Sequence, residues 1–129
     1  MPLLLDVTAA LIRDAAGRYL ITQRRPGSHL EGLWEFPGGK LDAGETLEAC
    51  LRRELGEELG ATFAVGPKVE TIRWEYPDRT IVLHVFECRL ESGTITPLEG
   101  QTMEWVEPDR LADYEFPPAD RTLLARLAR

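Results

Sequence analysis

Long apolar runs, cysteines and basic residues are all scarce in this sequence, and each scarcity argues against a class of protein. No run approaches the roughly 20 apolar residues that a membrane-spanning helix needs. The first residues carry no basic segment and soon reach Asp6, so we expect no signal peptide and a cytoplasmic location. The two cysteines, Cys50 and Cys88, are too few for a disulfide framework, and we expect each to be a small buried residue.

Basic residues are outnumbered, with 15 lysines and arginines against 22 aspartates and glutamates, and the net charge is −7. This charge argues against a protein that follows a nucleic-acid backbone, which requires a basic surface. An acidic protein can still bind a phosphorylated small molecule where a metal ion or a few arginines supply positive charge. From 129 residues, 43% of them hydrophobic, we expect one domain spanning residues 1–129, as a monomer or a homodimer.

Apolar segments bounded by Gly, Pro and Asp predict a series of strands. These segments cover residues 3–13, 19–24, 34–36, 69–76, 80–90 and 102–106. Residues 46–59 predict a helix that ends at Gly60, and Pro117 and Pro118 open a second helix. Residues 37–39 are predicted to form a loop. Strands on both sides of a central helix indicate an α+β fold, with a mixed sheet sandwiched between helices in an α/β/α arrangement.

Three glutamates of the central helix share one face, because Glu54, Glu57 and Glu58 stand at positions i, i+3 and i+4. One interpretation is an ordinary solvated face. Against it, Glu58 projects between Leu47 and Leu51, inside the apolar stripe. Clustered carboxylates repel one another unless a divalent cation such as Mg²⁺ binds them. From these residues alone, a solvated face and a metal site both remain open.

A 23-residue pattern joins the preceding turn to this helix. It consists of Gly39, Glu45, Arg53, Glu54, Leu55, Glu57, Glu58 and Gly60. The pattern resembles the signature of the Nudix hydrolases, which usually ends in a larger aliphatic residue where this chain has Ala61. Similarity to the MutT-type members of that family extends from Arg24 to Asp120, including the segment Glu35-Phe36-Pro37-Gly38-Gly39-Lys40. The resemblance therefore implies a Nudix fold over almost the whole chain.

The resemblance implies a Mg²⁺-dependent enzyme, with Mn²⁺ as an alternative ion, that hydrolyses a nucleoside triphosphate to a monophosphate and pyrophosphate. By the same resemblance, the metal ligands are the carbonyl of Gly38 and the carboxylates of Glu54, Glu57, Glu58 and Glu99. The catalytic residues implied are Arg53, Glu54, Glu57 and Glu99. Glu54 and Glu99 compete for the role of general base.

Further residues are implied to support the site or to bind the nucleotide. Glu45 and Arg53 would form an ion pair that fixes the loop against the helix, and Gly39 would also support the site structurally. Arg24 is the first candidate for a phosphate contact, and Arg79, in a turn, is a weaker one.

Two aromatic residues, Phe36 and Tyr76, are candidates for the walls of the base pocket. The alternative interpretation is that both belong to the hydrophobic core, because aromatic residues in strands usually do.

The identity of the base depends on Asp120, at a position where MutT-type enzymes carry an asparagine that reads oxidised guanine. An ionised aspartate only accepts hydrogen bonds, which suits either the N–H groups of an 8-oxo purine or the amino group of cytosine. It would alternatively be a favourable charge at the start of the last helix. We therefore expect 8-oxo-dGTP as the substrate, with CTP, dCTP or a modified pyrimidine nucleotide as the alternative. A Nudix domain that binds nucleotides without cleaving them is a third hypothesis.

Overall fold

The computed structural model describes residues 3–28 and 30–128, and its strands form two sheets. The larger sheet has the order β4 (Gly38–Lys40), β1 (Leu3–Ile12), β6 (Arg79–Ser92) and β5 (Thr62–Tyr76). The smaller sheet has the order β3 (Trp34–Glu35), β2 (Tyr19–Gln23) and β7 (Thr102–Val106). The pair β1 and β6 is parallel, and the other pairs are antiparallel, so the larger sheet is mixed.

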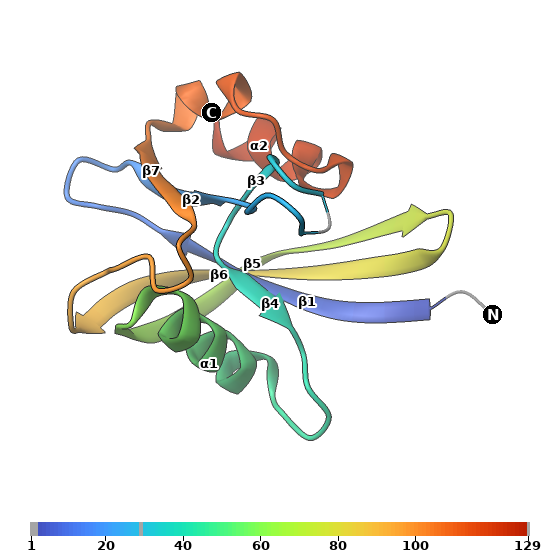
Figure 1. Ribbon diagram of the computed structural model, residues 1–129, viewed down its shortest axis with the longest axis horizontal. Helices are drawn as coiled ribbons and strands as arrows, with labels where there is room; N and C mark the ends of the chain where they lie inside the picture. Colours follow the sequence, from blue (N-terminus) through green and yellow to red (C-terminus); the bar gives the residue numbers. More distant parts are fainter. Residues whose placement is uncertain (1–2, 29, 129) are drawn as a thin grey trace.

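Helices lie on both sides of the mixed sheet, as Figure 1 shows. Helix α1 (Leu47–Leu59) covers one side. The other side carries the short 3₁₀ helices η1 (Pro108–Asp113) and η2 (Pro118–Asp120), together with helix α2 (Arg121–Leu127). The predicted α+β fold with a mixed sheet between helices is confirmed. Within the described residues, no helix combines the length and the apolar character needed to span a bilayer.

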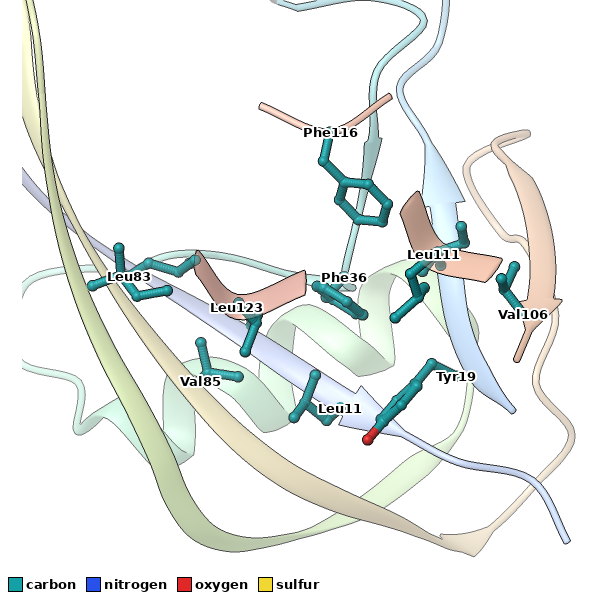
Figure 2. Close-up of a cluster of buried hydrophobic side chains, with 12 residues drawn as sticks. Leu11, Tyr19, Phe36, Leu83, Val85, Val106, Leu111, Phe116 and Leu123 are labelled. Atoms are coloured by element: carbon teal, nitrogen blue, oxygen red, sulfur yellow. The ribbon is translucent and has the colours of Figure 1, made fainter. Parts of the chain in front are cut away.

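Two hydrophobic clusters flank the mixed sheet because neighbouring residues of a strand point to opposite faces. On β1, Ala9 and Leu11 enter the cluster under α2 and η1, whereas Ala10 and Ile12 enter the cluster under α1. Figure 2 shows Phe36 near the centre of the first cluster. Of the two cysteines, Cys50 is buried as predicted, and Cys88 is only partly buried.

The prediction of a loop at residues 37–39 was wrong for its last two residues, because Gly38 to Lys40 pair with β1. Gly38 has a φ of 153°, and a β-carbon there would lie 2.0 Å from the Thr8 carbonyl oxygen. Glycine therefore permits an unusually close approach of the two strands. The approach fixes this segment against the centre of the mixed sheet.

Strand β5 begins at Thr62, seven residues before the predicted start, although Gly66 and Pro67 lie within it. The register against β6 shifts between Val65 and Lys68, so the proline falls in an irregular part of the ladder. Strand β5 is also an edge strand, where a missing N–H is tolerated. The short 3₁₀ helix η1 was not predicted from the sequence.

Candidate active site

Helix α1 carries the three predicted glutamates, and its two ends are well defined. The Thr46 side chain accepts a hydrogen bond from the Ala49 N–H at the first turn, and Gly60 ends the helix in the left-handed conformation, with φ 66°. Leu51, Leu55 and Leu59 are fully buried against the sheet. This packing sets the orientation of the polar face.

The three glutamates of α1 differ in exposure. Glu58 is only 8% exposed, as its place within the apolar stripe predicted. The Glu57 side chain, in contrast, is 51% exposed and lies next to Arg53. The Glu54 carboxylate lies under β4, where a β-carbon on Gly39 would approach it to 2.4 Å. Gly39 therefore lets the backbone of β4 lie directly against Glu54.

Arg53 connects the loop before α1 to the helix. Its Nε and Nη2 donate to the two carboxylate oxygens of Glu45 at 2.7 and 2.9 Å, a bidentate ion pair. Its Nη1 donates to Glu54 at 2.9 Å and to Glu57 at 3.1 Å. Arg53 holds the pKa of Glu45 down to about 2, and these carboxylates raise the pKa of Arg53. The ion pair expected between Glu45 and Arg53 is thus present.

A cavity of about 640 Å³ opens beside this cluster. Its lining includes Gly38, Gly39, Glu54, Glu58 and Glu99. It also includes Arg24, Glu35, Phe36, Tyr76, Arg79 and Asp120. The cavity thus brings together every predicted site residue except the Glu45, Arg53 and Glu57 group, which lies beside it. A volume of this size accommodates a small organic ligand.

Several carboxyl groups in this lining are crowded. Burial above all, together with the charges of Glu35 and Glu54, raises the pKa of Glu58 to about 9. Carboxyl groups that cannot all ionise at once are suited to bind a divalent cation, because its charge neutralises theirs. Their oxygen atoms are the ligands that Mg²⁺ prefers. Among the described residues, no three acidic, histidine or cysteine side chains are yet gathered closely enough to hold an ion. Arg53 instead holds Glu54 and Glu57.

Asp120 borders the cavity and is only 8% exposed. It stands at the N-cap of α2, but its side chain makes no capping hydrogen bond. Burial and the charge of Glu35, opposed by Arg24, raise its pKa to about 7. Asp120 therefore lines the cavity without capping the helix.

Glu35 was missed as a site residue by the sequence interpretation. Its carboxylate forms an ion pair with Arg24, in which Glu35 Oε1 lies 3.0 Å from Arg24 Nη2. Burial raises its pKa, Arg24 lowers it, and the charges of Glu99 and Glu54 raise it. Glu35 therefore interacts both with Arg24 and with the carboxyl groups of Glu54 and Glu99. The available signal was a charged residue in a short strand between two aromatic residues.

The remaining candidates line the cavity in different ways. Phe36 belongs both to the hydrophobic core and to the cavity wall. Its ring centroid lies 5.4 Å from that of Phe116 in the core, and the residue also borders the cavity. Tyr76 is partly buried, and burial raises the pKa of its hydroxyl. Arg79 borders the cavity and pairs with Asp78 at 3.0 Å. The aromatic residues thus form part of the cavity wall.

Fold and site together define an α+β protein in which a glycine-rich strand and a glutamate-rich helix line a ligand-sized cavity. A family model described as a NUDIX domain matches residues 8–126. The chain belongs to the Nudix hydrolase family.

Several known proteins are similar to this chain over most of its length. It is 39% identical over 124 residues to an 8-oxo-dGTP diphosphatase of Haemophilus influenzae, covering 96% of this chain and 91% of that protein. It is 38% identical over 121 residues to a CTP pyrophosphohydrolase of Escherichia coli, covering 94% and 89% respectively. The crystal structure of a MutT protein from Methanosarcina mazei matches with a TM-score of 0.85 at 26% identity, covering 98% of this chain and 94% of that one.

The raised pKa of Asp120 predicts how stability depends on pH. Between about pH 4 and pH 7 the folded protein keeps a proton that the unfolded chain has lost, so unfolding becomes easier as pH rises through this window. The slope is about 1.4 kcal/mol per pH unit for one such group. In urea titrations, the free energy of unfolding is expected to fall between pH 5 and pH 7. We expect this fall to be roughly 2 kcal/mol smaller for Asp120→Asn than for the wild type. Equal slopes for both proteins would contradict the assignment.

Proposed function

We propose that this protein is a Mg²⁺-dependent nucleoside triphosphate pyrophosphohydrolase that prefers 8-oxo-dGTP and releases the monophosphate and pyrophosphate. The observation that carries the proposal is the crowded carboxyl cluster of Glu54, Glu58 and Glu99 in the lining of a cavity of about 640 Å³. Relatives named 8-oxo-dGTP diphosphatase, at 39% and 36% identity, support the substrate.

The residues that would hold Mg²⁺, or Mn²⁺ in its place, are the carbonyl of Gly38 and the carboxylates of Glu54, Glu57, Glu58 and Glu99. When bound, the ion supplies positive charge that lowers the pKa of an attacking water and stabilises the leaving phosphate oxygen. In this structure Glu54 and Glu57 both accept hydrogen bonds from Arg53. Arg53 also makes the bidentate pair with Glu45.

Two groups compete to take the proton of the attacking water, namely the carboxylates of Glu54 and Glu99. Glu99 lies in an exposed loop and borders the cavity, whereas Glu54 is held by Arg53. The guanidinium groups of Arg24 and Arg79 border the cavity and supply the donors that phosphate oxygens require. We propose that these arginines orient the triphosphate with respect to the carboxylates.

Asp120 and the neighbouring walls would select the base. With a pKa of about 7, its carboxyl group is available both as a protonated donor and as an ionised acceptor near neutral pH. A protonated carboxyl offers a donor and an acceptor side by side, as an asparagine amide does. That pair matches the O6 and N7–H of 8-oxoguanine, with Phe36 and Tyr76 bordering the same space.

A second candidate function is hydrolysis of CTP, dCTP or a modified pyrimidine nucleotide. The 38% identical relative named CTP pyrophosphohydrolase favours this alternative. In its ionised form, Asp120 accepts a hydrogen bond from the 4-amino group of cytosine. The two candidates use the same phosphate chemistry and differ only at the base.

The proposed activity is tested with purified protein, Mg²⁺ and a panel of ordinary and oxidised nucleotides, with identification of the products. We expect monophosphate and pyrophosphate, and the highest kcat/KM for 8-oxo-dGTP. Asp120→Asn is expected to alter the ratio of kcat/KM values between 8-oxo-dGTP and CTP more than it alters kcat for either. No pyrophosphate from any nucleotide would refute the enzyme, and a higher kcat/KM for CTP would establish the second candidate instead.

Glu58→Gln separates the role of this residue in chemistry from its role in folding. Because burial keeps Glu58 protonated at neutral pH without metal, a neutral glutamine is expected to leave the metal-free thermal midpoint unchanged or raise it. Activity with Mg²⁺ is expected to fall by two or more orders of magnitude. Glu48→Gln, on the exposed first turn of the same helix, is the matched control. Retention of activity in Glu58→Gln would show that Glu58 is not a metal ligand.

A further inference from the structure

The loop between β6 and β7 is attached to the carboxyl end of helix α1. The last carbonyl groups of a helix have no partner within it and require donors from elsewhere. Here the Thr96 N–H donates to the Leu59 carbonyl at 2.8 Å, and the Leu98 N–H donates to the Glu58 carbonyl at 3.0 Å. The loop that carries Glu99 is thus bound to the helix that carries Glu58.

One side chain completes this attachment at Glu99 itself. The Gln101 Nε2 donates to the Glu58 carbonyl at 2.9 Å, and its Oε1 accepts the Glu99 N–H at 2.9 Å. The two hydrogen bonds fix the orientation of the amide, because only the nitrogen donates and only the oxygen accepts. Gln101 is partly buried, whereas Glu99 is exposed. A single amide therefore connects the main chains of two residues whose carboxylates border the same cavity.

Electrostatic repulsion acts against this arrangement. Glu35, Glu58 and Glu99 line the same cavity, and ionised carboxylates that share one site repel one another. Repulsion favours movement of Glu99 toward solvent, and its loop has little packing to resist that movement because residues 96–100 are exposed. The hydrogen bonds of Gln101 oppose the repulsion before any cation arrives.

We propose that Gln101 is a positioning residue that holds Glu99 beside Glu58 and thereby raises the affinity of the site for a divalent cation. This proposal rests on the proposed function, in which Glu58 and Glu99 are both metal ligands. Gln101 acts only through the backbone of these residues, since its amide is engaged by the Glu58 carbonyl and the Glu99 N–H. Gln101, a neutral residue outside the acidic cluster, therefore positions a member of that cluster.

The experiment is a double-mutant cycle of Gln101→Leu and Glu99→Gln, read out by the Kd for Mn²⁺ in the absence of nucleotide and by kcat and KM with Mg²⁺. Leucine is similar in size to glutamine but forms neither hydrogen bond. We expect Gln101→Leu to weaken Mn²⁺ binding by about 10-fold, as loss of supporting hydrogen bonds around a metal site does, and to lower kcat more than it changes KM. In the Glu99→Gln background, Gln101→Leu is expected to have no further effect on either quantity.

The matched control is Thr96→Val in the same loop, which removes only the hydrogen bond from the Thr96 hydroxyl to the Thr94 carbonyl. We expect it to bind Mn²⁺ as the wild type does. Wild-type affinity in Gln101→Leu overturns the proposal, and so do additive effects of the two substitutions, which would mean that Gln101 does not act through Glu99.

Hydrogen exchange in the wild type tests the same contact without a substitution. The Glu99 amide is expected to exchange at least about 10-fold more slowly than an unprotected amide, because its N–H is bonded to Gln101. Unprotected exchange overturns the proposal even if the Gln101→Leu variant does not fold. Absence of both Mn²⁺ binding and hydrolysis in the wild type refutes the proposed function, whereas full activity with an unaffected Gln101→Leu variant refutes only this inference.

Discussion

Mutual repulsion among carboxyl groups is the constraint on which the rest of this structure depends. Glu35, Glu54, Glu58 and Glu99 come from a strand, a helix and a loop and border one cavity, and their proximity raises the pKa values of Glu35 and Glu58. Without a cation, burial and this crowding raise the pKa of Glu58 to about 9. A protein gains nothing in stability from such an arrangement, which is why it indicates a binding function.

Three features of the surrounding structure keep the carboxyl groups together. The buried leucines of α1 fix the rotation of the helix, and its caps fix its ends. Gly38 and Gly39 allow β4 to lie against β1 and against Glu54. Arg53 joins the loop before the helix to the helix itself, and Gln101 joins the loop after β6 to the end of the helix. The framework thus opposes repulsion with neutral contacts and with two arginines, Arg53 at Glu54 and Arg24 at Glu35.

The helix and its buried glutamate were predictable from sequence because both follow from local periodicity, which placed Glu58 within the apolar stripe. The strand at Gly38 was not, because it depends on the pairing of Gly38 with Ala9, 29 residues earlier. Glu35 and Gln101 were missed for a similar reason. The role of Glu35 arises from its contact with Arg24, and that of Gln101 from its contact with Glu58, 43 residues away at the end of α1. No local pattern encodes either contact.

A cation site at the crowded carboxyl cluster is tested most directly by the protons released when Mn²⁺ binds. Because metal binding requires the ionised carboxylate, the ion must displace the proton of Glu58. Calorimetric titrations near pH 7.5, in two buffers of different ionisation enthalpy, are expected to give about one proton released per cation bound. Binding without proton release, or no binding at all, would contradict the account.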